Sequence, residues 1–112
     1  MPHLVIEYAA SLKDDINVQA LVDAAFTGAD ESALFTSHDI KVRAIPYAAY
    51  STAGTNQAFV HVEIKLLSGR TSVQKKDLAE RVFAKVTANV PNTVAVSIET
   101  NDLDRDTYTK RV

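Results

Sequence analysis

Four stretches of the chain alternate between apolar and polar residues, and this period of two predicts four β-strands. We expect these strands at 2–8, 39–45, 58–67 and 93–100. In the first, Leu4, Ile6 and Tyr8 share one face, and polar side chains share the other with Val5. Such alternation is typical of strands that bury one face only. The predicted sheet therefore has one apolar face and one mixed face.

Two further stretches have the three- and four-residue spacing of amphipathic helices. The apolar positions of the first are Val18, Leu21, Val22, Ala25 and Phe26. Gly28 is expected to end this helix, because glycine is a common stop signal. The second helix is expected to begin at Thr71, which has with Gln74 the spacing of a capping box, and to end at 89–91. Its apolar stripe is Leu78, Ala79, Val82, Phe83 and Val86.

The order of elements describes one β-α-β unit that occurs twice, in 2–46 and 58–100, before a polar tail at 101–112. Parallel strands joined by a helix follow a right-handed crossover, so both helices should cover the same face of the sheet. The predicted fold is therefore a single α+β domain, 1–112, with a four-stranded mixed sheet and two helices on one face. The uncovered face is half polar, and we expect it to pack against other subunits.

Composition narrows the possible functions. The 112 residues are 46% apolar and 23% charged, with a net charge of −2 and no basic run, so nucleic acid is not an expected partner. There is no cysteine for a disulfide or a thiolate metal site, and the three histidines lie far apart, so we expect no metal. No apolar run or signal peptide indicates a membrane, and we expect a cytoplasmic protein.

The first candidate for chemistry is Pro2. If Met1 is removed, Pro2 carries a free secondary amine at the head of a core strand. Burial disfavours the charged form of an amine and so lowers its pKa, and a neutral amine near pH 7 can act as a general base. The plainer interpretation is that proline only starts the strand, where its missing N–H costs least.

Two arginines are candidates for binding an anion. Arg70 follows Gly69 and precedes a helix, where a guanidinium, backbone N–H groups and the helix dipole could act together; alternatively it points into solvent. Arg43 lies mid-strand, opposite the face of its apolar neighbours, and could instead be an interface or solvated arginine. Arg81, Arg105 and Arg111 are interpreted as surface residues. His61 is interpreted as a hydrogen-bonded strand histidine.

Together these features resemble the tautomerase superfamily, and within it the 5-carboxymethyl-2-hydroxymuconate Δ-isomerase family. The resemblance runs from Met1 to about Thr100. It rests on the opening Met-Pro-His-Leu-Val-Ile-Glu-Tyr, on Arg43 in its strand, on the run 59–62 and on the turn 69–71.

The resemblance implies loss of the initiator methionine, with the nitrogen of Pro2 as the proton shuttle. It implies that Arg43 and Arg70 hold the carboxylates of the substrate and polarise its carbonyl, in a homotrimer with sites near subunit boundaries. The implied reaction moves a proton in an unsaturated keto-diacid during homoprotocatechuate degradation, without cofactor or metal. An arginine can stabilise the dienolate that forms when a proton leaves the carbon beside a carbonyl.

Three alternatives remain open at the level of the sequence. The chain could be a tautomerase for another enol or keto acid, with its preference set by the loop at 47–57. It could be a non-catalytic, trimeric ligand-binding module of the same fold. It could also be a ferredoxin-like binding domain, which would order its strands differently and would not form a trimer.

Overall fold

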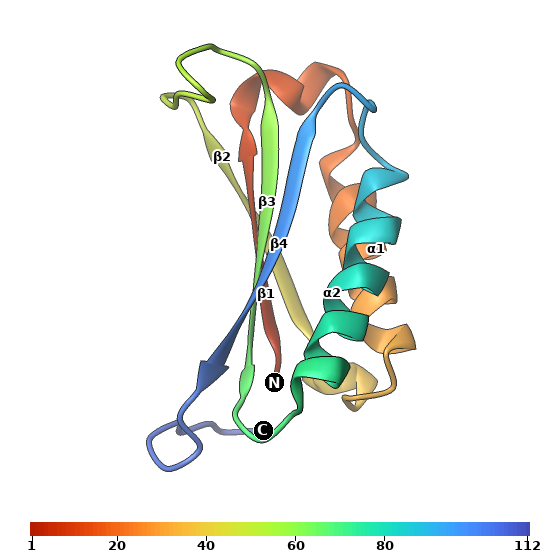
Figure 1. Ribbon diagram of the computed structural model, residues 1–112, viewed down its shortest axis with the longest axis vertical. Helices are drawn as coiled ribbons and strands as arrows, with labels where there is room; N and C mark the ends of the chain where they lie inside the picture. The colour runs from red at the N-terminus through yellow and green to blue at the C-terminus, as the bar shows by residue number, and fades with distance from the viewer.

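The computed structural model describes residues 1–112 and is built on a four-stranded mixed sheet in the order β2-β1-β3-β4 (Figure 1). The strands are β1 (His3–Ala9), β2 (Lys41–Tyr47), β3 (Phe59–Leu67) and β4 (Ala95–Leu103). β1 is parallel to β2 and antiparallel to β3, and β3 is parallel to β4. Helices α1 (Val18–Glu31) and α2 (Ser72–Thr87) lie side by side on one face of the sheet (Figure 1). The predicted α+β fold with two β-α-β units is confirmed.

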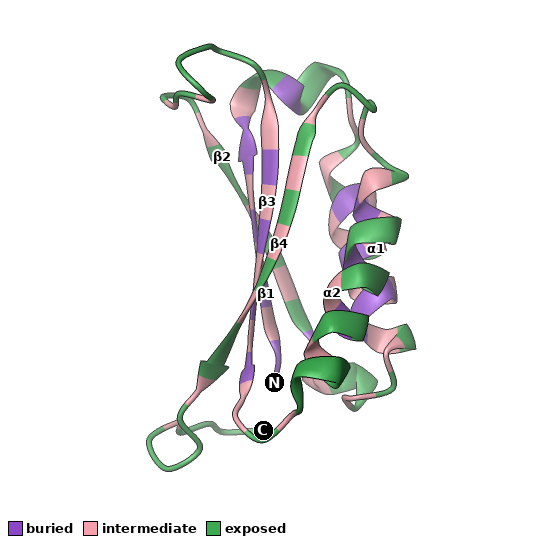
Figure 2. Ribbon diagram, viewed as in Figure 1, coloured by how far each residue is buried: buried purple, intermediate pink, exposed green.

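The core lies between this sheet face and the two helices, and Figure 2 shows the buried residues concentrated on β1, β3 and the helix faces that cover them. Alternate residues of the two central strands are buried, namely Leu4, Ile6, Tyr8, Val60, Val62, Ile64 and Leu66. The helices contribute Leu21, Ala25, Ala29, Leu78, Val82 and Val86. Complete burial of one aliphatic side chain stabilises the fold by about 1.5–3 kcal/mol. The apolar residues that alternate with polar ones in the sequence of these two strands are therefore core residues.

The prediction that Gly28 ends the first helix is wrong, because α1 continues to Glu31. A Cβ atom at Gly28 would lie 2.8 Å from the Cα of Val82 and 2.9 Å from the carbonyl oxygen of Arg81. Glycine is needed here because the backbones of α1 and α2 approach closely. Close approach between helices is a tertiary requirement that the local pattern does not report.

The capping box predicted for α2 is confirmed. The Thr71 hydroxyl accepts the N–H of Gln74 at 3.1 Å, and the Gln74 side chain accepts the N–H of Thr71 at 2.9 Å. The predicted apolar stripe is only partly right, because Phe83 is 44% exposed. Ala10–Asp14 forms a separate 3-10 helix before α1, and Asn17 caps α1 by accepting the N–H of Ala20.

Two strands are shifted toward the C-terminus relative to the prediction. β2 begins at Lys41, because Ser37–Asp39 forms a 3-10 turn, and it includes Pro46, which an edge strand tolerates. β4 continues to Leu103, whose carbonyl accepts the N–H of Ser68 at 3.0 Å. The expected tail at 101–112 therefore begins as a strand.

The sheet face away from the helices is mixed, as predicted. Val5 and Phe59 lie half-buried on it among polar side chains, including Glu7. His61 contacts Ser97 at 2.6 Å and Glu99 at 2.5 Å, so the prediction of a hydrogen-bonded strand histidine is confirmed. None of the helices is both long enough and apolar enough to cross a membrane.

Candidate active site

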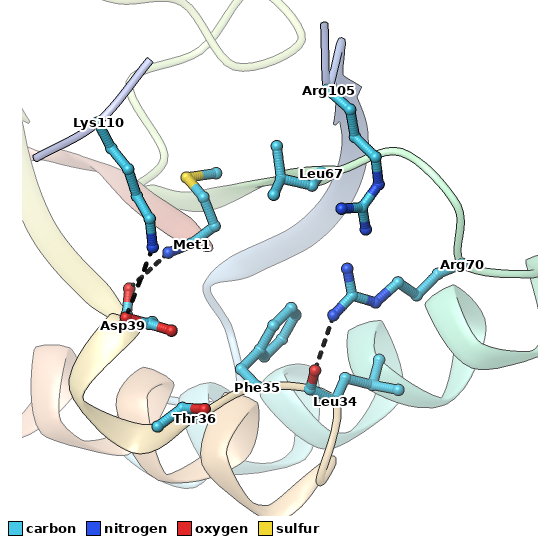
Figure 3. Close-up of a pocket in the computed structure, with 9 residues that line it drawn as sticks. All are labelled: Met1, Leu34, Phe35, Thr36, Asp39, Leu67, Arg70, Arg105 and Lys110. Atoms are coloured by element: carbon cyan, nitrogen blue, oxygen red, sulfur yellow. Dashed lines mark hydrogen bonds and ion pairs between the residues drawn. The ribbon is translucent and has the colours of Figure 1, made fainter. Parts of the chain in front are cut away.

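A cavity of about 210 Å³ opens at the end of the sheet where β1 starts and β3 ends (Figure 3). Four separate parts of the chain line it: the N-terminus, the connection after α1, the turn between β3 and α2, and the C-terminal segment. The lining residues are Met1, Leu34, Phe35, Thr36, Asp39, Leu67, Arg70, Arg105 and Lys110. The cavity thus depends on the tertiary fold and not on one motif.

The N-terminus is fixed at this cavity. Pro2 is fully buried, and its carbonyl accepts the N–H of Lys41 at 3.1 Å. Met1 is 8% exposed and lines the cavity, and its ammonium donates to the carbonyl oxygen of Asp39 at 3.0 Å. Burial lowers the pKa of this ammonium from its ordinary value, Asp39 opposes the shift, and Lys110 adds to it. The environment at this end of β1 therefore favours a neutral amine.

Arg70 points into the cavity (Figure 3). Its Nη2 donates to the carbonyl oxygen of Leu34 at 2.8 Å, and the guanidinium lies over the ring of Phe35, 5.2 Å from its centroid. Gly69 has φ +123, a left-handed conformation that strongly favours glycine, and so sets the turn that directs Arg70. The capping box uses the N–H groups of Thr71 and of its partner at N3, so these two amides are not free for an anion.

Arg105, interpreted from the sequence as a surface residue, is exposed, and it also lines the cavity beside Arg70. Its Nε donates to the carbonyl oxygen of Ser68 at 2.5 Å. Lys110, which the sequence did not single out, also lines the cavity and lies 3.9 Å from the Asp39 carboxylate. Both cations belong to a polar stretch without periodicity, so no local signal pointed to them.

The structure does not bring Arg43 to this cavity. Arg43 is exposed on the sheet face away from the helices and donates to Nδ1 of His3 at 3.0 Å. Since arginine cannot accept, Nδ1 is the acceptor and Nε2 carries the proton toward the hydroxyl of Tyr108, 2.9 Å away. Burial and the Arg43 charge lower the pKa of His3 from its ordinary value. Arg43 thus helps to hold the C-terminal segment against β1.

The charges around the cavity are unequal. Three cationic side chains, Arg70, Arg105 and Lys110, face one carboxylate, Asp39. No group of three or more His, Asp or Glu side chains is arranged to hold a metal ion. A small cavity with a positive excess and a buried chain terminus is suited to an anionic ligand and to proton transfer by an amine.

Residues 2–111 match the family model of 5-carboxymethyl-2-hydroxymuconate isomerase. The chain belongs to this family. It is an isomerase of the tautomerase superfamily, and the recognition made from the sequence is confirmed.

Several solved structures have the same fold as this chain. A 5-carboxymethyl-2-hydroxymuconate delta-isomerase matches with a TM-score of 0.84 at 18% identity, covering 100% of this chain and 88% of the other. A 5-carboxymethyl-2-hydroxymuconate isomerase from Deinococcus radiodurans R1 matches with a TM-score of 0.82 at 23% identity, covering 98% and 88%. A structure named Q0 fused 4-OT wild type symmetric trimer matches with a TM-score of 0.70 at 20% identity, covering 89% and 85%. No curated protein sequence matches the chain.

Proposed function

We propose that this isomerase moves a proton between two carbons of an unsaturated keto-diacid such as 5-carboxymethyl-2-hydroxymuconate. The amine of Pro2, exposed by removal of Met1, takes the proton and returns it. The observation that carries the proposal is the fully buried Pro2 directly behind Met1, at a cavity lined by three cations. The family to which the chain belongs supports the choice of substrate.

The position of Pro2 supports its role as the base. Removal of Met1 moves the chain terminus back by one residue, about 3.8 Å between Cα atoms, and vacates the part of the cavity that Met1 lines. Pro2 is more buried than Met1, and burial already lowers the pKa of the Met1 ammonium. We therefore expect the Pro2 amine to have a lowered pKa and to be partly neutral near pH 7.

The positive charge of the cavity suits the intermediate. Loss of a proton beside the carbonyl leaves a dienolate, and fixed cations stabilise negative charge as it develops. Arg70 is held by Leu34 and Phe35, so it can bind a substrate carboxylate without first being ordered. The same amine then returns the proton at the distal carbon, so no cofactor is required.

A trimer would complete the site. The uncovered sheet face carries half-buried apolar residues, and one similar structure is named as a symmetric trimer. Arg43 lies on that face, so we assign it to a site shared with a neighbouring subunit, where it would polarise the substrate carbonyl. In this proposal the enzyme acts in the cytoplasm, in the degradation of homoprotocatechuate.

The test compares Pro2→Ala with the wild type and with Arg111→Ala, which changes an exposed arginine outside the cavity. The absence of Met1 is first verified by mass in each preparation. We expect Pro2→Ala to lower kcat for the diacid by about 100-fold or more, the scale of general base catalysis, and Arg111→Ala to leave it unchanged. A Pro2→Ala variant as fast as the wild type would contradict the proposal and favour a non-catalytic module. If the wild type turned over the enol of phenylpyruvate but not the diacid, the result would favour the alternative of a tautomerase that acts on another enol or keto acid.

A further inference from the structure

We propose that Arg105 is a second carboxylate-binding residue, which together with Arg70 grips one carboxylate of the substrate and makes the site selective for diacids over monoacids. This inference deepens the proposed function and rests on it for the class of substrate.

The two guanidinium groups are arranged as a pair. Figure 3 shows them pointing toward one another across one side of the cavity. Each is oriented by a backbone carbonyl, Arg70 by that of Leu34 at 2.8 Å and Arg105 by that of Ser68 at 2.5 Å. A guanidinium has five N–H groups, so each arginine keeps further donors for a ligand. Carboxylates accept such donors two at a time, in the plane of the guanidinium.

Neither arginine has a carboxylate partner. The seven salt bridges of the chain include neither Arg70 nor Arg105. The one carboxylate that lines the cavity belongs to Asp39, and it lies 3.9 Å from Lys110. Two like charges held face to face repel one another, and a carboxylate between them removes this repulsion. The pair is therefore a preformed anion site.

The position of the pair selects which carboxylate it binds. In Figure 3, Arg70 and Arg105 lie on one side of the cavity, and Met1 lies on the other side with Lys110. Phe35 is drawn between the two sides. A substrate whose reacting carbon lies at the N-terminus would place its far carboxylate at the arginines. A monoacid lacks that group, so the pair discriminates by a contact that only diacids make.

The C-terminal segment that carries Arg105 is anchored on both sides of it. Before it, the carbonyl of Leu103 accepts the N–H of Ser68 at 3.0 Å. After it, the carbonyl of Asp104 accepts the N–H of Tyr108 at 3.0 Å, and the Tyr108 hydroxyl contacts His3 at 2.9 Å. These contacts hold the turn that presents Arg105, so the pair exists before a ligand arrives.

The test is the binding of cis,cis-muconate, an unsaturated diacid, measured by isothermal titration calorimetry. We expect Arg105→Gln to weaken binding by about 10- to 100-fold, the scale of a charged hydrogen bond. Arg105→Lys keeps the positive charge but loses the planar guanidinium, so its affinity for muconate is expected to lie between those of the wild type and Arg105→Gln. Arg111→Gln, the same change at an exposed site six residues on, is the control and should bind like the wild type.

Kinetics then tests the selectivity. Arg105→Gln should lower kcat/KM for the diacid by a similar factor and leave turnover of a monoacid enol nearly unchanged. Muconate binding by Arg105→Gln that equals the wild type, no binding by the wild type, or an equal loss for diacid and monoacid would each overturn the inference. Binding does not depend on turnover, so a normal rate in Pro2→Ala would refute the proposed function and leave this result standing.

Discussion

Replacement of Gly28 by alanine should destabilise the protein, although alanine is the better helix former. At an ordinary helical position this change would gain about 1 kcal/mol. Here the new Cβ would lie 2.8 Å from the Cα of Val82, against an optimal carbon separation of about 3.5 Å or more. Because the obstacle is backbone and not a flexible side chain, α1 and α2 would have to separate by about 0.7 Å.

The cost should exceed the gain in helix propensity. Overpacking a close contact costs about 1–3 kcal/mol, and separation of the helices also loosens the layer formed by Leu21, Leu78 and Val82. Subtracting the propensity gain leaves a net destabilisation of up to about 2 kcal/mol. For a domain of this size that corresponds to a fall in Tm of up to about 15 °C.

Thermal unfolding followed by circular dichroism, at one protein concentration, measures this effect. Ala84→Gly is the matched control, because Ala84 is exposed on α2 and the reverse change there should lower stability through propensity alone, by about 1 kcal/mol. The structure thus predicts that both changes are destabilising. A Gly28→Ala variant with an equal or higher Tm would refute the close approach of the two helices.

Three further results are expected. Arg70→Ala should lower kcat/KM for the diacid by about 10- to 1,000-fold, measured by steady-state kinetics, and normal turnover would remove Arg70 from the site. Arg43→Ala should lower kcat if the site is shared between subunits, and an unchanged rate would remove Arg43 but leave Pro2 in place. His3 should titrate by NMR below its ordinary pKa of 6.5, because burial and Arg43 disfavour its charge. His3 therefore binds a proton more readily in the unfolded state than in the folded state. Its contribution to the free energy of unfolding is complete above pH 6.5 and is lost as the pH falls toward the pKa of His3 in the folded state. A measured pKa of 6.5 or higher in the folded protein would contradict this prediction.

The sheet could be predicted from the sequence because its central strands bury every second residue. Leu4 and Ile6 in β1, and Val62 and Ile64 in β3, are fully buried, and each pair is separated by a half-buried residue of the opposite face, Val5 and Glu63. The capping box at Thr71 was equally visible because it is a local motif. In both cases the residues that determine the local structure lie close together in the sequence, so the sequence pattern alone predicts that structure.

The ends of the elements and half of the cavity could not be predicted in this way. Gly28 has the sequence signature of a helix stop, but its role is contact with α2, 54 residues away. Arg105 and Lys110 lie in a polar segment whose position is set by β4 and by the contact between Tyr108 and His3. Only the folded chain shows that these cations face the N-terminus.

In the proposed mechanism Pro2 acts through a free amine, and comparison of two forms of the same protein tests this. One form retains Met1, so that the nitrogen of Pro2 is an amide, and the other begins at Pro2; intact mass verifies each. Both are assayed for isomerisation of the diacid at equal concentration. We expect turnover by the form that begins at Pro2 and none by the form that retains Met1. Full activity with Met1 in place would contradict it, because an amide nitrogen cannot take the proton.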